Sequence, residues 1–153
     1  MKYDDASWHY GSEEFPADLP EESGATHIGM FLAWAVLNGL GDADFLADVD
    51  LDKLKSRTVT PGIWFLESCD GKFVDSELSE AGNSFADYYY MKPANFPRYI
   101  AQYRKTFSEI KDDYRIPDTW ESYERLGPIL SRQFANWTEN GPEKIAWWKR
   151  IFG

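Results

Sequence analysis

Residues 28–41 read IGMFLAWAVLNGLG and form the longest stretch of the chain without a charged residue or a histidine. Apolar side chains fall on nearly every face of a helix drawn through this stretch, which predicts a helix that is buried on all sides. Ser23 offers an N-cap before it, and Gly39 with Gly41 supplies a stop. A run of 14 residues is shorter than the roughly 20 that a membrane-spanning helix needs. The stretch therefore predicts the central helix of a globular core, over residues 23–38.

The rest of the chain also carries helical patterns, and we predict a mainly α fold of about six or seven helices. The length of 153 residues fits a single compact domain, with residues 1–22 as an irregular extended arm packed on a helical core over 23–153. Further helices are expected near 50–55, over Pro61 to Ser68, from Asp75 or Ser76 to Tyr89, over Phe96 to Ile110, after Asp118 with a break or a kink at Gly127-Pro128, and after Pro142 through Ile145, Trp148 and Ile151. A short hairpin near 63–74 is the alternative to the second of these helices, because Asp70-Gly71 is typical of a tight turn.

The charges are distributed unevenly along the chain. The protein has 26 acidic and 16 basic residues and a formal net charge of -10, yet residues 1–52 hold twelve of the acids and one base, Lys2. Such a balance argues against binding to nucleic acid, because that affinity comes from cations that neutralise phosphates. It argues equally against binding to an anionic membrane surface.

The acidic first third allows two interpretations. It is either a solvated face that keeps the protein in solution or a docking surface for a cationic partner, and one-signed fields favour such encounters. For the second interpretation, the candidate partner-binding residues are Asp42, Asp44, Asp48, Asp50, Asp52, Glu13, Glu14, Glu21 and Glu22.

The two histidines of the chain, His9 and His27, both lie in this acidic region. Together with Trp8 and Tyr10 they form a candidate ligand pocket. With Asp18, Glu21 or Glu22 they would supply two imidazoles and a carboxylate for zinc or iron. Their separation of 18 residues gives no helical pairing to support that site. We therefore predict no metal and no cofactor, and a structural role for His27.

Sequence signatures of catalysis are missing from the chain. It contains no nucleophile elbow, P-loop, dinucleotide-binding glycine motif or H-E-x-x-H pair. The single cysteine, Cys69, allows no intramolecular disulfide and is expected to be a core or boundary residue. We predict no catalytic residues and no enzyme activity. The N-terminus lacks the pattern of a secretory signal, which predicts a cytoplasmic protein.

Several short segments of the sequence resemble a family of small bacterial proteins of unknown function. These segments are Trp8-His9-Tyr10, residues 15–20 (FPADLP), residues 26–34 (THIGMFLAW), Thr60-Pro61-Gly62, residues 69–73 (CDGKF), residues 82–86 (GNSFA) and Asp118-Thr119-Trp120. The chain departs from that family at Ser12-Glu13-Glu14, where a shorter Gly-Asp junction is expected. The resemblance implies no catalytic residue, and it suggests an association with bacterial toxin systems, in which small acidic proteins act as immunity factors.

These observations favour a binding protein, most concretely an immunity protein that neutralises a cognate toxin or effector by covering its basic surface. A small enzyme or a metal- or ligand-binding protein that uses His9 and His27 is the first alternative. A subunit that self-associates through Tyr88-Tyr89-Tyr90 is the second, because three successive tyrosines cannot all face inward from one helix. The sequence does not fix the oligomeric state.

Overall fold

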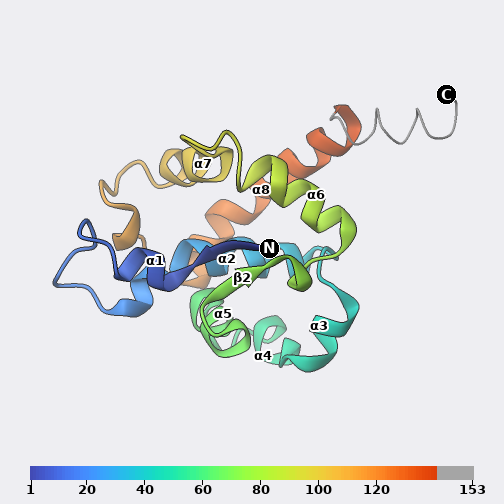
Figure 1. The fold of residues 1–153 in the computed structure, drawn as a ribbon, viewed down its shortest axis with the longest axis horizontal. Coiled ribbons are helices and arrows are strands. Elements are labelled where there is room, and N and C mark those ends of the chain that lie inside the picture. Colours follow the sequence, from blue (N-terminus) through green and yellow to red (C-terminus); the bar gives the residue numbers. More distant parts are fainter. Residues whose placement is uncertain (141–153) are drawn as a thin grey trace, which may run out of the picture.

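A computed structural model describes residues 1–140, and Figure 1 shows a body of helices with a pair of short strands across it. The elements in chain order are β1 (Lys2–Asp5), α1 (Ala6–Tyr10), η1 (Glu21–Gly24), α2 (Thr26–Leu37), α3 (Ala43–Asp48), α4 (Leu51–Lys55), α5 (Pro61–Cys69), β2 (Lys72–Val74), η2 (Asp75–Glu77), α6 (Glu80–Tyr89), α7 (Arg98–Thr106), η3 (Asp113–Arg115) and α8 (Trp120–Asn140), where η marks a 3-10 turn. The predicted mainly helical class is confirmed. Within residues 1–140, no helix combines the length and the apolar character that crossing a membrane requires.

Helix α2 lies at the centre of the body, and its residues from Thr26 to Val36 are all buried. Its rings pack against rings of α6 and α7, with centroid distances of 5.7 Å for Trp34 and Phe85 and 5.1 Å for Phe31 and Tyr99. Helix α2 also meets α5 closely, since a Cβ added at Gly29 would lie 2.7 Å from the Cα of Gly62. The structure thus agrees with a central helix, which begins after η1 at Thr26 instead of at Ser23.

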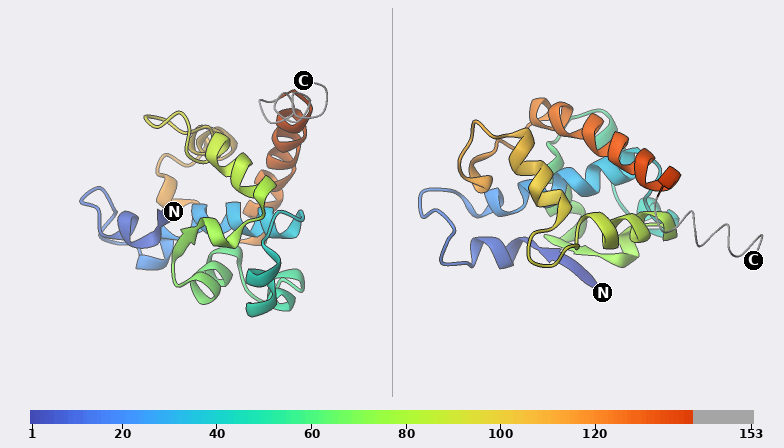
Figure 2. Two further views of the ribbon diagram at one scale, coloured as in Figure 1. Left: turned by 45° about the vertical axis from the view of Figure 1, so that its right-hand side comes forward. Right: turned by 90° about the horizontal axis from the view of Figure 1, so that it is seen from above.

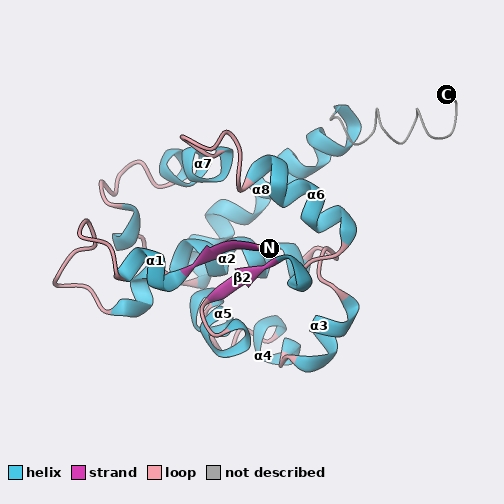
Figure 3. Cartoon of the chain, viewed as in Figure 1, coloured by secondary structure: helices cyan, strands magenta, loops and turns pink. Residues whose placement is uncertain are grey.

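The N-terminal segment differs from the irregular arm that we predicted, because residues 2–10 form two regular elements. Strand β1 pairs antiparallel with β2, with Asp4 opposite Phe73 and Asp5 opposite Lys72 (Figure 3). The Asp5 carboxylate then caps α1 by accepting a hydrogen bond from the Ser7 N–H. The irregular part is the loop over 11–20. This pairing could not be predicted from sequence patterns, since the two strands are some 70 positions apart and only four and three residues long.

Three short helices follow α2, and each begins at a capping side chain. Asp42, Asp50 and Thr60 accept hydrogen bonds from backbone N–H groups at the starts of α3, α4 and α5. Because Thr60 caps α5 and Pro61 occupies its first position, residues 61–69 are helical, and the alternative hairpin near 63–74 does not form. The strand that follows Gly71 pairs with β1 instead.

The second half of the described chain contains α6, α7 and α8, of which α8 is the longest at 21 residues. Helix α6 starts at the Ser79 cap, later than predicted, because residues 75–77 form η2. We predicted a break or a kink at Gly127-Pro128, and the break does not occur, because helix α8 runs through Pro128. Leu126 and Leu130, on either side of this exposed proline, are both buried, and their packing offsets the lost backbone hydrogen bond. The helix predicted after Pro142 lies outside the described residues.

Candidate functional site

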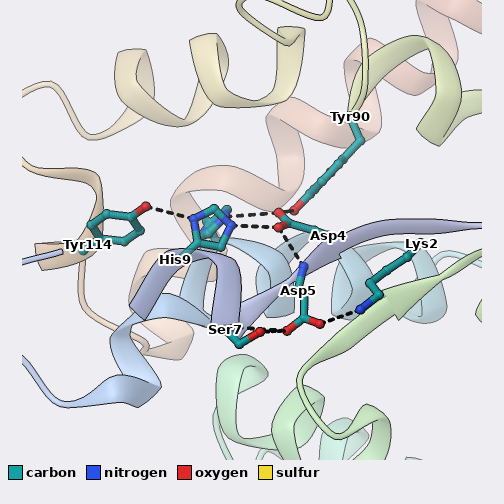
Figure 4. Close-up of polar contacts among 8 residues, drawn as sticks. Lys2, Asp4, Asp5, Ser7, His9, Tyr90 and Tyr114 are labelled. Atoms are coloured by element: carbon teal, nitrogen blue, oxygen red, sulfur yellow. Dashed lines mark hydrogen bonds and ion pairs between the residues drawn. The ribbon is translucent and has the colours of Figure 1, made fainter. Parts of the chain in front are cut away.

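The Asp4 carboxylate is the centre of a buried polar cluster. Strand β1 turns this side chain toward the core, and the residue is only 8% exposed. One oxygen, Oδ1, accepts a hydrogen bond from the Asp5 N–H at 2.8 Å, and the other, Oδ2, accepts one from the Tyr90 hydroxyl at 2.6 Å. These two donors fix the orientation of the carboxylate, as Figure 4 shows.

Both histidines of the chain face this carboxylate. His9 on α1 places Nε2 2.7 Å from Asp4 Oδ1, and His27 on α2 places Nε2 3.4 Å from Asp4 Oδ2. The two rings meet edge to face, with centroids 4.4 Å apart. We call Asp4, His9 and His27 the Asp–His–His cluster. It unites three elements that are separate in the sequence.

Two further tyrosines hold the histidines in place. The Tyr114 hydroxyl on η3 lies 2.8 Å from His9 Nδ1, so both ring nitrogens of His9 have partners. The Tyr99 hydroxyl donates a hydrogen bond to the backbone carbonyl of His27. The supports of the cluster therefore extend to η3 and α7.

The surroundings of the cluster lower the pKa values of Asp4 and His27 and raise the pKa of Tyr90, relative to the isolated groups. Burial alone would raise the pKa of Asp4, but the imidazoles of His27 and His9 outweigh it and hold that pKa well below its usual range. Burial lowers the pKa of His27, and the Asp4 carboxylate offsets this only in part. Burial also raises the pKa of the Tyr90 hydroxyl, which stays a hydrogen-bond donor to Asp4.

The structure brings together His9 and His27 from the candidate pocket, but it places the other members elsewhere. Trp8 and Tyr10 point outward from α1 and are 55% and 37% exposed. The carboxylate beside the histidines is Asp4, which our sequence reasoning missed because Asp4-Asp5 looks like part of a solvated acidic surface. The acids considered for that role lie outside the cluster: Asp18 pairs with Arg115, and Glu21 and Glu22 are exposed on η1.

Trp8 and Tyr10 are exposed on α1, and four of the candidate partner-binding acids are exposed in the stretch of chain from α1 to η1. Tyr10, Glu21 and Glu22 line a hollow of about 310 Å³ between α1, η1 and the end of α5. The packing of η1 on α1 depends on Gly24, where an added Cβ would lie 3.2 Å from the backbone of Ala6 and of Tyr10. We define the α1–η1 surface as Trp8, Tyr10, Glu13, Glu14, Glu21 and Glu22, all of them exposed.

The other candidate acids lie on α3 and α4. Asp42 accepts hydrogen bonds from the N–H groups of Asp44 and Phe45, and Asp50 accepts one from Lys53. Asp44, Asp48 and Asp52 are exposed. We call residues 42–52 the α3–α4 segment. The loop that precedes η1 lies at one end of the long axis of the molecule and α3 lies toward the other, so the acids form two separate groups (Figures 1 and 2).

The Asp–His–His cluster lies in the part of the chain that matches a known protein family. Residues 2–116 match the family described as Domain of unknown function (DUF7832). No curated protein and no solved structure matches the chain. The matched region includes Asp4, His9, His27, Tyr90 and Tyr114 and ends before α8. This match agrees with the predicted resemblance to an uncharacterised family, and the description assigns no activity.

Proposed function

Because the chain belongs to the DUF7832 family, whose function is unknown, we propose from its surface that it is a binding protein for a partner with a basic surface. The observation that carries the proposal is the exposure of Tyr10 beside Glu21 and Glu22, together with the exposure of Trp8 on the same short helix α1. Large aromatic rings bury much apolar area in protein interfaces and are enriched among the residues that contribute most to binding.

The chemistry of this surface matches a cationic partner. Trp8 and Tyr10 would supply the desolvated centre of an interface, and the four carboxylates would form its polar rim. Carboxylates at a rim attract a basic partner over a distance and disfavour acidic ones. The Lys2 Nζ lies 5.2 Å from the Trp8 ring and forms an ion pair with the Asp5 carboxylate at 2.7 Å. The positive charge beside Trp8 is therefore already paired within the protein.

The surface is also held in position before any partner arrives. Strand β1 is paired with β2, Asp5 caps α1, and His9 on the inner side of α1 contacts Asp4 and Tyr114. A surface that is already ordered loses little conformational entropy on binding, which favours affinity. The exposed rings of α1 therefore belong to a helix whose position is held by contacts with β1, Asp4 and Tyr114.

The most concrete form of this proposal is immunity. In that form the partner is a cognate bacterial toxin or effector, and the protein neutralises it by covering a basic surface on it. The strongly acidic first third of the chain and the lack of catalytic signatures in the sequence support this form.

The experiment is co-expression with the product of the adjacent reading frame, scored by co-purification and by cell growth. We expect wild-type protein to form a complex and to restore growth. Trp8→Ala should weaken the complex about 30-fold, because it removes an anchor of the interface. Phe96→Ala is the matched control, since Phe96 is 44% exposed and lies outside the α1–η1 surface. Equal affinity of the two variants, or continued toxicity with wild-type protein, would refute the proposal.

A further inference from the structure

The Asp–His–His cluster has the composition of a transition-metal site. One ligand atom from each of Asp4, His9 and His27 lies within 4.8 Å of the other two. Two imidazoles and one carboxylate suit Zn²⁺ and Fe²⁺, whereas Mg²⁺ and Ca²⁺ take oxygen ligands. From this convergence we propose that the cluster binds one divalent transition-metal ion, of which Zn²⁺ is the representative.

The distances from the two imidazoles to Asp4, each measured to a different carboxylate oxygen, can be compared with those of a metal site. With bonds of about 2.0–2.1 Å, the ligand atoms of a tetrahedral Zn²⁺ site are about 3.3 Å apart. His27 Nε2 and Asp4 Oδ2 are 3.4 Å apart, which already fits. His9 Nε2 and Asp4 Oδ1 are 2.7 Å apart, so the His9 ring would move outward by a fraction of an ångström.

His9 is also the ligand that can move and admit the ion. Its side chain is 22% exposed, against 5% for His27 and 11% for Asp4. An ion would thus enter from the His9 side, between α1 and η3, while the other two ligands stay fixed in the core.

The groups around the cluster are those that support metal ligands in proteins. A metal-bound histidine typically uses its second ring nitrogen in a hydrogen bond, and Tyr114 lies 2.8 Å from His9 Nδ1. The Tyr90 hydroxyl and the Asp5 N–H orient the Asp4 carboxylate, and each carboxylate oxygen keeps a further lone pair for a metal. Two imidazoles and one carboxylate also leave a coordination position for water.

A competing explanation is that a proton occupies the centre of the cluster. In that case one histidinium neutralises Asp4, and the cluster only anchors α1 to α2. The two explanations differ in what excess Zn²⁺ does. A metal site gains an ion at a stoichiometry of one, whereas a protonated pair gains none and shows only weak association with the exposed acids.

The experiment uses the full chain, stripped with a chelator and titrated with Zn²⁺ and with Co²⁺ as a spectroscopic probe. We expect one equivalent of Zn²⁺ to bind, the thermal midpoint to rise with Zn²⁺ but not with Mg²⁺, and Co²⁺ to give visible absorption bands typical of mixed nitrogen and oxygen ligands. His9→Gln should abolish these bands. Tyr114→Phe should weaken affinity about tenfold, because it removes only the support of His9.

Two controls keep the result interpretable. Asp44→Asn removes an exposed acid on α3 and should leave Zn²⁺ affinity unchanged, which separates the cluster from general binding to acids. Circular dichroism establishes that His9→Gln is folded, and the wild-type Co²⁺ spectrum provides a test that needs no variant. The absence of stoichiometric binding to wild-type protein, or equal affinity of wild type and folded His9→Gln, would overturn the proposal. Partner binding by Trp8 is a separate property, so either can fail alone.

Discussion

The α1–η1 surface and the α3–α4 segment are both rich in acids, but the structure uses their carboxylates differently. In the α3–α4 segment, Asp42 and Asp50 accept backbone hydrogen bonds at the starts of two helices. On the α1–η1 surface, Glu21 and Glu22 lie beside a hollow and next to exposed Tyr10. Acid density alone therefore does not separate helix caps from the proposed binding surface, and the exposed Tyr10 ring beside the acids is the feature that led us to propose the α1–η1 surface.

A third acidic group completes the comparison. Asp4 and Asp5 belong to the same acidic third of the sequence, yet both are buried, and Asp4 contacts two histidines and Tyr90. Asp4 holds the inner side of α1, so it supports the α1–η1 surface from below. Because the carboxylates of these three groups have different roles, substitutions in them should change stability by different amounts.

Replacing the buried carboxylate should have the largest effect on stability. Asp4→Ala leaves two histidines and the Tyr90 hydroxyl without their shared partner in the core, and we expect a loss of about 3–5 kcal/mol in the free energy of unfolding. Urea unfolding monitored by tryptophan fluorescence measures this loss. Asp44→Ala, at an exposed site, is the control. A similar loss of stability in both variants would contradict the different roles assigned to Asp4 and Asp44.

Acid should destabilise the protein in two steps. The folded-state pKa values of His27 and Asp4 are both lowered, so the unfolded chain takes up these protons first, and stability rises with pH. Stability should be full above about pH 6.5, decline below it as unfolded His27 is protonated, and decline further below about pH 4 through Asp4. Unfolding free energies between pH 3 and pH 8 test this, and Asp4→Asn should flatten the lower step.

The helix caps of the α3–α4 segment should give a moderate effect. Asp42→Ala removes the acceptor for two N–H groups at the start of α3 and should cost about 1 kcal/mol, with little recovery at high salt. Asp42→Asn keeps a capping oxygen and should be close to wild type. A loss of partner binding without any loss of stability in Asp42→Ala would place this acid in an interface instead.

The smallest effect on stability is expected at the exposed aromatic ring of α1. Trp8→Ala should change the free energy of unfolding by no more than about 0.5 kcal/mol, since the ring is 55% exposed. Thermal unfolding followed by circular dichroism is the measurement. A loss of several kcal/mol would show that Trp8 supports the fold and would remove it from the proposed interface.

Local patterns in the sequence predicted the helical part of the fold well. The apolar run of α2 requires burial on all sides, and Thr60 with Pro61 specifies where α5 begins. The pairing of β1 with β2 could not be predicted, because its register depends on contacts between segments some 70 positions apart. Helix α8 passes through Pro128 for a similar reason, since burial of the flanking leucines is a tertiary effect.

The candidate site was predictable only in part. His9 and His27 stood out as the two histidines of the chain, but their spacing predicted no contact, because a strand, a loop and two helices bring them together. Charge patterning did not distinguish Asp4 from the other acids in the first third of the sequence. Its one distinguishing sign is its position beside Tyr3 in a strand-like segment, which charge patterning does not detect.

The measurement that tests the central claim most directly compares charge reversals in the two acidic groups. Glu21→Lys with Glu22→Lys changes the α1–η1 surface, and Asp44→Lys with Asp52→Lys changes the α3–α4 segment by the same charge at exposed positions. Titration calorimetry with the co-purified partner should show about a 100-fold loss of affinity for the first pair and little loss for the second. Equal losses, or a larger loss for the second pair, would contradict the assignment of the binding surface to α1 and η1.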